Sequence, residues 1–381
     1  MSSETGQAFD LIVLGAGPAG ASAARCAAGA GLRVALIDKA RFPRDKLCGG
    51  GLTGRAIGQF AQIFARPLPG VPLEKRSEIT FHAFGEDLGT SVDAPPLHLA
   101  MRREFDAHLV DMAIEAGAVD FTGQDVRRDG TCVWSGETHL QAPLLIAADG
   151  VNSQTAKELF GQAFDRDKIG FALEVEQPGG DPARPLRIDF GAADWGYGWQ
   201  FPKTCGTTVG VGGIMARNPD MKAHMARYMA DLGIDKSLKV KGQFLPFGEL
   251  RPVPGQGRVL LAGDAAGLVD PLTGEGIAYA MQSGALAARA VLGALKASRP
   301  DEALRAYRRS LRPIHANIRH AARLRHLMFN PRLRPFFLRQ FSGSQRMRAD
   351  YLHLLAGEME YGPLMRRLMF RLPGKMLRAL G

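Results

Sequence analysis

Residues 15–20 read Gly-Ala-Gly-Pro-Ala-Gly and separate an apolar run from an alanine-rich run. In such a Gly-x-Gly-x-x-Gly turn, Gly15 permits the tight turn, Gly17 lets the backbone approach phosphates, and Gly20 lets the following helix pack on the strand. Backbone N–H groups and the positive end of the helix dipole then face a pyrophosphate. Asp38 closes the next apolar run, where a carboxylate can bind ribose hydroxyls. These residues predict a dinucleotide site. The alternative, a plain tight turn, would not explain why the three glycines and the acid occur together.

Two later segments also place an acid beside a glycine directly after an apolar run. Asp149 follows residues 143–148, and Asp264 follows residues 258–262. The Asp264 carboxylate can accept hydrogen bonds from the hydroxyls of a sugar-alcohol chain, although an aspartate at this position could also cap a helix. Both acids are therefore candidates for contacts with the same dinucleotide.

A further segment, residues 271–276, reads Pro-Leu-Thr-Gly-Glu-Gly and precedes a long apolar run. A helix that begins there would present its positive end to the ring of a flavin, which is anionic when reduced. Because separate segments of the chain agree, the sequence predicts FAD as the cofactor.

The order of these motifs resembles that of the p-hydroxybenzoate hydroxylase superfamily of FAD proteins. The resemblance implies that Asp264 holds the ribityl chain, and that residues 274–276 present N–H groups to the pyrimidine edge of the flavin. It also implies that Asp149 lies on the pyrophosphate side and that Arg102 reaches the cofactor, with a surface salt bridge as the alternative for Arg102. The residues that the resemblance assigns to cofactor binding are Gly15, Gly17, Ala19, Gly20, Asp38, Lys39, Cys48, Gly49, Arg102, Asp149, Gly263, Asp264, Gly274, Glu275, Gly276 and Ile277.

Two more segments resemble signatures of the geranylgeranyl reductases. Residues 46–51 read Lys-Leu-Cys-Gly-Gly-Gly, and residues 197–203 read Tyr-Gly-Trp-Gln-Phe-Pro-Lys. The similarity extends to residues 273–277 and to the basic tail, so it covers essentially the whole chain. It implies an enzyme that saturates isolated double bonds of polyprenyl chains carried on chlorophyll precursors, archaeal lipids, quinones or diphosphates.

The residue types in these segments suit that chemistry. An isolated alkene is unpolarised, so hydride transfer to one carbon must be coupled to protonation of the other, in an apolar channel with one proton donor. On a strand, Tyr197, Trp199 and Phe201 share one face, and with Pro202 they are the predicted substrate-binding residues. Cys48, Tyr197 and Trp199 are the predicted catalytic residues. An aromatic core face and a small buried thiol are the alternatives, and the proton donor, water included, stays open.

Three other functions remain as alternatives, two enzymatic and one not. A flavin monooxygenase on the same scaffold would oxygenate an apolar substrate. A halogenase is more remote, because Tyr197 and Phe201 depart from its Trp-x-Trp-x-Ile-Pro element. A flavin-bearing lipid carrier without turnover is the non-enzymatic alternative. The chain has no second Gly-x-Gly-x-x-Gly motif after an apolar run, so NAD(P)H or another electron donor, ferredoxin-type donors included, is expected to bind transiently.

The pattern of short apolar runs predicts an α/β fold with a Rossmann-like FAD-binding domain, an inserted antiparallel β-sheet substrate domain and a C-terminal helical segment. Strands are expected near residues 9–14, 32–37 and 143–148, because these runs are almost wholly apolar. The sequence pattern changes in residues 156–250, where Gly and Pro separate short expected strands. The expected division is 1–65, 100–155 and 251–310 for the FAD-binding domain, 66–99 and 156–250 for the substrate domain, and 311–381 for the basic helical region.

The positive charge of the chain is confined to its tail. The formal net charge is +10, and residues 301–381 contain 17 Lys and Arg against 5 Asp and Glu. Arginines interleave there with leucines and phenylalanines, as in a helix that contacts anionic lipids. A helical cap that packs on the body with its charges in water is the equal alternative. Nucleic acid is not expected as a partner, because no recognition motif is present.

The remaining sequence features predict a cytoplasmic enzyme, peripheral on the inner face of the membrane if the tail binds lipid. The amino terminus lacks the basic region of a secretory signal, and no run of 18 apolar residues occurs. The four cysteines have unrelated spacings, typical of neither a metal site nor a disulfide framework. Monomer and oligomer both remain open.

Overall fold

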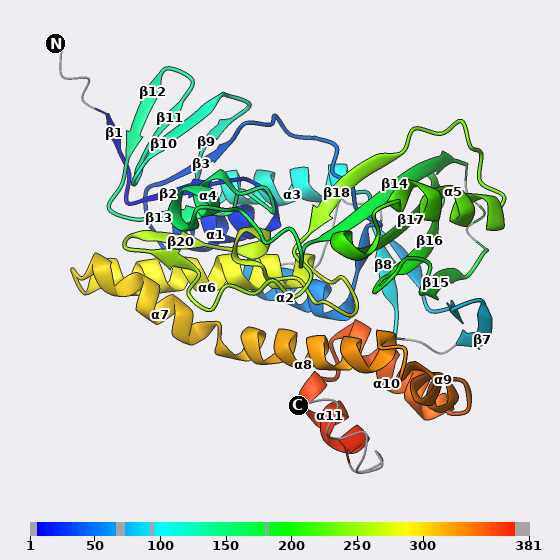
Figure 1. The fold of residues 1–381 in the computed structure, drawn as a ribbon. Helices are drawn as coiled ribbons and strands as arrows, with labels where there is room; N and C mark the ends of the chain where they lie inside the picture. Colours follow the sequence, from blue (N-terminus) through cyan, green and yellow to red (C-terminus); the bar gives the residue numbers. More distant parts are fainter. Residues whose placement is uncertain (1–5, 66–72, 92–94, 180, 182, 370–381) are drawn as a thin grey trace.

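The computed structural model describes residues 6–65, 73–91, 95–179, 181 and 183–369. One half of the molecule contains a six-stranded sheet (Figure 1). Its strand order is β19-β20-β13-β2-β3-β9. Its five strands from β20 to β9 run parallel, and β19 pairs antiparallel with β20 at the edge. Their bounds are β2 Leu11–Leu14, β3 Val34–Asp38, β9 Val119–Thr122, β13 Leu145–Ala147, β19 Gly255–Gln256 and β20 Val259–Leu261. The predicted α/β class is confirmed.

Three helices pack with this sheet into one apolar core, namely α1 Pro18–Ala28, α3 Arg102–Glu115 and α6 Ile277–Lys296. Small side chains allow the close approach of α1 and α6. A Cβ on Gly284 of α6 would collide with the backbone oxygen of Ala19 in α1. The alanine-rich composition of both helices is therefore what lets the glycine turn and the α6 N-terminus share one side of the sheet.

A second, four-stranded sheet lies beside the first and was not predicted. Its order is β1-β12-β11-β10, with bounds β1 Gln7–Ala8, β10 Val126–Asp129, β11 Cys132–Ser135 and β12 Thr138–Gln141. Two tight hairpins connect β10 to β12, and Gly130 and Gly136 lie in those turns at φ of 57° and 58°. Glycine is favoured at such left-handed positions.

The other half of the molecule is a seven-stranded sheet in the order β18-β14-β17-β16-β15-β6-β7 (Figure 1). All its pairs are antiparallel except β15 with β6, so the predicted antiparallel sheet is present. Their bounds are β6 Ile79–Ala83, β7 Glu86–Ser91, β14 Gly170–Pro178, β15 Leu186–Phe190, β16 Tyr197–Lys203, β17 Gly206–Ile214 and β18 Lys241–Leu245. β4 Gly51–Leu52, β5 Glu74–Arg76 and β8 Leu97–Leu99 form a small third sheet.

The remaining described helices are α2 Gly54–Phe64, α4 Gln154–Phe160, α5 Met221–Asp231, α7 Ala303–Ser310, α8 Arg312–Phe329, α9 Arg334–Ser342, α10 Gln345–Ala356 and α11 Tyr361–Met369. α9, α10 and the end of α8 lie along the seven-stranded sheet, and α11 packs on α8 (Figure 1). Leu324 and Phe341 from these helices share an apolar cluster with Phe81 and Phe190 of the sheet. The apolar side of the basic tail therefore packs on the body, and residues 370–381 lie outside the described part.

Among the described residues, no helix combines the length and apolarity needed to cross a bilayer.

Candidate active site

The predicted glycine turn has the geometry that its sequence indicates. Gly15 has a φ of +95°, and a Cβ on Gly20 would collide with the carbonyl oxygen of Gly15, so strand and helix approach more closely than any other residue would permit. Gly17 is the N-cap of α1 and provides no side-chain cap. The N–H groups of the first turn of α1 thus remain available to an anion.

Asp38 and Asp149 lie next to this turn but use their side chains differently. The Asp38 carboxylate accepts hydrogen bonds from the N–H of Ala16 at 2.8 Å and of Ala40 at 2.9 Å, which anchors β3 to the turn. The Asp149 backbone touches the turn, but its carboxylate accepts hydrogen bonds from Ser153 and Thr155 at the start of α4. Lys39, in the next position after Asp38, is exposed.

Three cations gather between the glycine turn and Asp264. Arg102 is 8% exposed and forms a bidentate pair with Asp106 of its own helix, with both distances 2.8 Å. Arg44 lies 3.2 Å from the same carboxylate. Burial lowers the pKa of Lys46, and the nearby Asp264 opposes the change. The predicted salt bridge of Arg102 therefore exists, but it is buried at the site rather than on the surface.

Asp264 sits in the short turn Gly263–Ala266, and a Cβ on Gly263 would come 3.0 Å from Cβ of Ala19. Burial raises the pKa of Asp264, and Lys46 and Arg102 oppose the shift. The N-cap of this turn is Ala262, so Asp264 does not have the N-cap role that was the alternative, and the charges of Lys46 and Arg102 act on its carboxylate.

The loop 271–276 leads into α6, whose N-cap Gly276 provides no side-chain cap. Ile277 is the first residue of α6. Gly274 has a φ of +72°, and a Cβ there would collide with the Tyr197 hydroxyl. That hydroxyl donates a hydrogen bond to the Thr273 carbonyl at 2.9 Å. The aromatic strand and the glycine loop, more than 70 positions apart, are thus in direct contact.

The Cys48 loop lies against the other end of the same aromatic face. A Cβ on Gly49 would stand 2.9 Å from the Phe201 ring and 3.1 Å from Nε1 of Trp199. The rings of Tyr197 and Trp199 are 5.9 Å apart. The structure thus brings Cys48, Tyr197, Trp199 and Phe201 together, and Pro202 follows as a buried residue of β16.

Beneath the Cys48 loop lies a buried acid that sequence reasoning missed. Glu174 of β14 is 2% exposed and accepts a hydrogen bond from the Cys48 N–H at 3.1 Å. Burial raises its pKa to about 7, and Lys203 opposes the shift. Lys203 is itself 2% exposed and donates a hydrogen bond to Thr208. Lys203 stands in the aromatic segment, but no local pattern indicated that it would be buried beside Glu174.

The side chain of Glu275 faces α2. Its carboxylate accepts a hydrogen bond from Thr53, the N-cap of α2, and lies 3.5 Å from Nε of Arg55. Burial raises the pKa of Glu275 to about 7, and Arg55 opposes this. If Glu275 contributes to cofactor binding, it does so through its backbone and its neighbouring glycines. Arg55 was also missed, because its charge is balanced by residues far away in the sequence.

The residues present fit FAD. Two helix N-termini, at Gly17 and at Gly276, lack a side-chain cap, and among the described residues Arg44 Nη1 is buried without a hydrogen-bond partner. Uncapped N-termini and a buried cation accommodate an anionic dinucleotide. We find no group of three or more metal-ligating side chains in the described part of the chain.

Comparison with known families agrees with this geometry. The family described as FAD dependent oxidoreductase matches residues 10–118, and a family of FAD binding domains matches residues 254–322. Together these ranges contain the glycine turn, the Cys48 loop, Arg102 and the loop that begins α6. The protein is an FAD-dependent oxidoreductase.

Similarity to curated relatives indicates which family of FAD-dependent oxidoreductases the chain belongs to. The chain is 32% identical over 319 residues to a geranylgeranyl diphosphate reductase of Rhodobacter capsulatus, covering 77% of this chain and 78% of the relative. It is also 32% identical over 309 residues to a menaquinone reductase of Mycobacterium tuberculosis, covering 73% and 75%. The chain belongs to the geranylgeranyl reductase family of FAD-dependent oxidoreductases.

Solved structures share the fold. A geranylgeranyl bacteriochlorophyll reductase-like protein from Thermoplasma acidophilum superposes with a TM-score of 0.78 at 21% identity, covering 96% of this chain and all of that one. A flavin-dependent brominase reaches 0.68 at 19% identity, covering 96% of this chain and 98% of that one. At these identities the likeness concerns architecture, which reductases and halogenases have in common.

Proposed function

We propose that this enzyme saturates isolated carbon–carbon double bonds of a geranylgeranyl or longer polyprenyl chain. The observation that carries the proposal is the contact of the Cys48 loop with the aromatic face of β16. Gly49 touches both Trp199 and Phe201, and Tyr197 reaches the loop that begins α6. An apolar, aromatic surface between two loops of the FAD site suits a flexible hydrocarbon chain.

Each residue type has a defined task in this reaction. When bound, FAD supplies the hydride for one alkene carbon. Trp199 and Phe201 exclude water and hold the prenyl chain flat. Tyr197, whose pKa is raised by burial, keeps its hydroxyl proton and fixes the loop at Thr273. Cys48 lies beside the reacting carbons.

The named relatives support the choice of reaction. The Rhodobacter relative is named for a geranylgeranyl diphosphate, and the mycobacterial relatives for a menaquinone. Both names describe reductases whose substrates carry an isoprenoid chain. A monooxygenase acting on an apolar substrate remains the alternative, because the shared fold also serves oxygen-dependent enzymes.

The test is the mass of the product. Enzyme reduced with dithionite under anaerobic conditions is expected to add two hydrogens per double bond to geranylgeranyl diphosphate, geranylgeraniol or menaquinone. A product that gains oxygen, and only in air, would establish the monooxygenase instead. Cys48→Ser is expected to lower turnover at least about 10-fold, a loss typical of a displaced catalytic contact. Cys205→Ser, at an exposed cysteine, is the matched control and should retain full activity.

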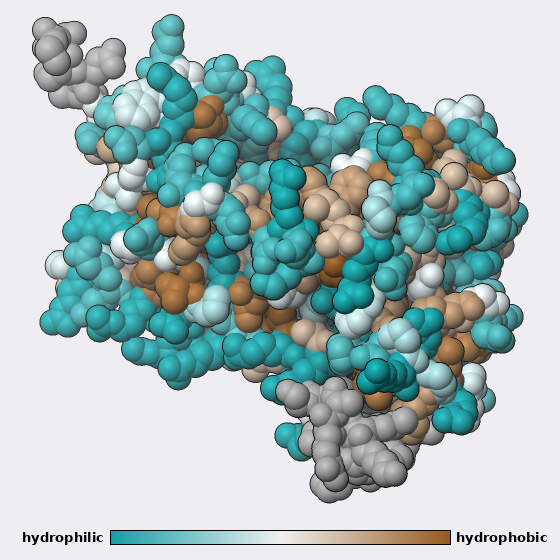
Figure 2. Space-filling view, viewed as in Figure 1, coloured by the Kyte–Doolittle hydropathy of each residue, from teal (hydrophilic) through white to brown (hydrophobic). Residues whose placement is uncertain are grey.

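The arginines of α7 and α8 suit delivery of such a substrate from a lipid surface. Residues 303–349 contain 12 arginines and no acid, and the surface over α7 is hydrophilic (Figure 2). The exposed members on α7 and α8 are Arg305, Arg308, Arg309, Arg312, Arg319 and Arg323. We infer that this basic surface docks on anionic lipid, because each such side chain near the membrane adds about 1 kcal/mol of attraction.

Vesicle sedimentation tests the docking. Binding to vesicles with anionic lipid should weaken as salt rises and should decrease when Arg308, Arg312 and Arg319 are replaced by Gln. Unchanged binding of that triple variant would remove the idea.

A further inference from the structure

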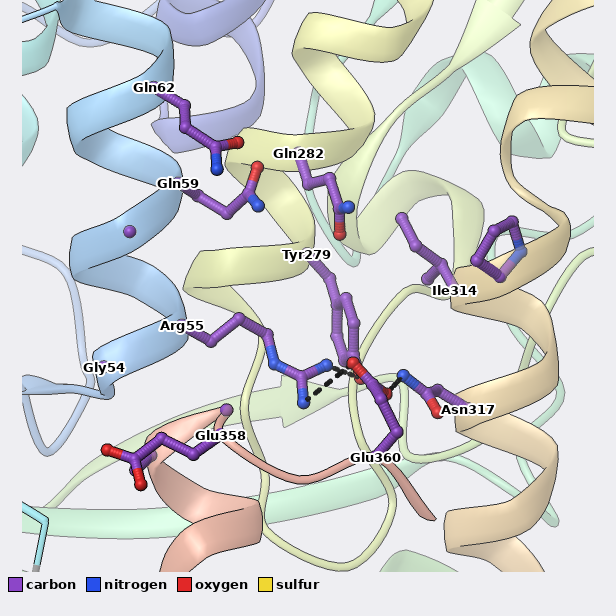
Figure 3. Close-up of a pocket in the computed structure, with 14 residues that line it drawn as sticks. Gly54, Arg55, Gln59, Gln62, Tyr279, Gln282, Ile314, Asn317, Glu358 and Glu360 are labelled. Atoms are coloured by element: carbon purple, nitrogen blue, oxygen red, sulfur yellow. Dashed lines mark hydrogen bonds and ion pairs between the residues drawn. The ribbon is translucent and has the colours of Figure 1, made fainter. Parts of the chain in front are cut away.

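A pocket of about 400 Å³ lies between α2, α6, α8 and the connection of α10 to α11 (Figure 3). Polar side chains point into it, among them Gln59 of α2, Gln282 of α6 and Asn317 of α8. Carboxamides both donate and accept hydrogen bonds, and a roomy polar cavity holds water. The described residues that line it include none from β16 or the Cys48 loop, so it is distinct from the proposed substrate surface.

The inner wall of this pocket reaches the FAD site through one side chain. Arg55 lines the pocket and donates a hydrogen bond to the Tyr279 hydroxyl at 2.8 Å. Its Nε lies 3.5 Å from the carboxylate of Glu275. Arg55 is 10% exposed and Glu275 is 7% exposed. The Arg55 side chain therefore stands between the pocket and the carboxylate of Glu275, the residue between Gly274 and Gly276.

The groups around Glu275 shift the pKa of its carboxyl in opposite directions. Burial raises its pKa to about 7, while Arg55 and the hydrogen bond from Thr53 oppose the shift. Asp270 and Glu360 raise the pKa further. Glu360 is 54% exposed at the pocket and lies 3.7 Å from Arg55, so this chain of charges begins in solvent.

We propose that Glu275 takes up a proton from solvent through this pocket when the bound flavin is reduced, and returns it there when the flavin is reoxidised. The inference rests on the FAD-dependent redox activity and not on the prenyl substrate. Two electrons from an external donor, with one proton, would go to bound FAD. A second proton bonds to a carboxylate oxygen of Glu275, and water in the pocket supplies it. On reoxidation that O–H bond breaks and the proton returns to the same water.

Electrostatics gives the reason for this coupling. If residues 274–276 hold the ring as the resemblance implies, reduction of bound FAD would add a negative charge beside the loop in which Glu275 lies. A new negative charge near a carboxylate raises its affinity for a proton, and little water intervenes to screen the effect. The device would keep the net charge of the buried site nearly constant in both redox states.

Proton uptake on reduction tests the proposal without any substrate. The holoenzyme is photoreduced anaerobically at about pH 8, where a carboxyl with a pKa near 7 is mostly ionised before reduction. A pH-indicator dye then reports protons consumed per two electrons, and infrared difference spectra report a carboxylic acid C=O band. Wild type is expected to consume up to about one proton more than Glu275→Gln, and the infrared band should be lost in that variant.

Two further variants make the test decisive. Glu358→Gln changes an acid at the pocket mouth that pairs with His353, and it should consume as many protons as wild type. A Cβ on Gly58 would meet no atom within 4 Å, and Gly58 lines the pocket, so Gly58→Leu can fill the pocket. This variant should slow proton uptake at least about 3-fold without changing its total. Equal proton consumption by wild type and Glu275→Gln, both with bound flavin, would overturn the assignment. Unaltered uptake kinetics in Gly58→Leu would overturn the route. Failure of the prenyl-reductase assay would touch neither result.

Discussion

Glu174 and Glu275 are buried carboxyl groups in different parts of the FAD site, and burial raises the pKa of each to about 7. Their surroundings differ. Glu174 lies under the Cys48 loop with Lys203, and both are 2% exposed. Glu275 pairs with Arg55, which lines a pocket of about 400 Å³. A pKa raised to about 7 thus occurs once in a closed environment and once behind a polar pocket.

The two acids show that the pKa of a buried carboxyl and its rate of proton exchange with solvent have different structural causes. Glu174 orders the Cys48 loop through the Cys48 N–H, and a closed site suits that static task. Glu275 lies behind Arg55 at the wall of the pocket, where water that passes the Arg55 side chain can exchange protons with it, and an open site suits a group that titrates during turnover. Burial and charge set the proton affinity of each acid, whereas the neighbouring cavity sets its role.

The largest expected difference between the two acids follows from removing their cations. Lys203→Met leaves Glu174 buried without its cation, so the free energy of unfolding at about pH 8 should fall by about 3–5 kcal/mol. Arg55→Met should cost only about 1–2 kcal/mol, because pocket water can hydrate Glu275. Urea unfolding of both variants measures the difference. Equal losses would show that the pocket does not solvate its acid.

The pH dependence of stability sharpens the comparison. The folded-state pKa of both acids is about 7, above the ordinary value of 4.5. Between these values the native protein binds more protons than the unfolded chain, so stability falls as pH rises, by up to about 3 kcal/mol per acid. Glu174→Gln and Glu275→Gln should each remove one such contribution from the unfolding free energy measured between about pH 5 and pH 8.

Redox state should then distinguish the two acids. In wild type, anaerobic reduction should move the Glu275 part of this pH dependence to higher pH, and the Glu174 part should stay in place. Burial also lowers the pKa of Lys203, and that contribution has the opposite sign, because it makes stability rise with pH. A redox-dependent shift that survives in Glu275→Gln would contradict the distinction.

The sequence predicted those parts of the site whose residues lie close together along the chain. Gly15, Gly20 and Asp38 lie in one strand-helix-strand unit, so their spacing alone sets their geometry. The hairpins of the four-stranded sheet also carried a local signal, Asp-Gly at 129–130 and Ser-Gly at 135–136, typical of tight turns. The sheet was missed because its strands are short and mostly polar.

The buried acids could not be predicted in the same way. Glu174 contacts Cys48 across 126 positions, and Thr53 contacts Glu275 across 222. Whether a charged residue is buried depends on which distant segments cover it, and periodicity within its own strand carries no information on that. The tail shows the same limit, since its Arg and Leu pattern predicted helices but left open whether the apolar side packs on protein or lipid.

The smallest expected effect concerns the bond that joins the two regions. The Tyr197 hydroxyl donates to the Thr273 carbonyl at 2.9 Å, so it connects the strand beside the Cys48 loop with the segment before Glu275. Tyr197→Phe should lower the free energy of unfolding by only about 1 kcal/mol, the usual net worth of one hydrogen bond. If the two regions act as one site, this small loss should accompany a clear fall in kcat with prenyl substrate. Ser310→Ala removes the bond from an exposed hydroxyl to Ala306 and serves as the control for stability. A Tyr197→Phe enzyme that loses stability but keeps its kcat would show that the aromatic strand and the Glu275 loop work independently.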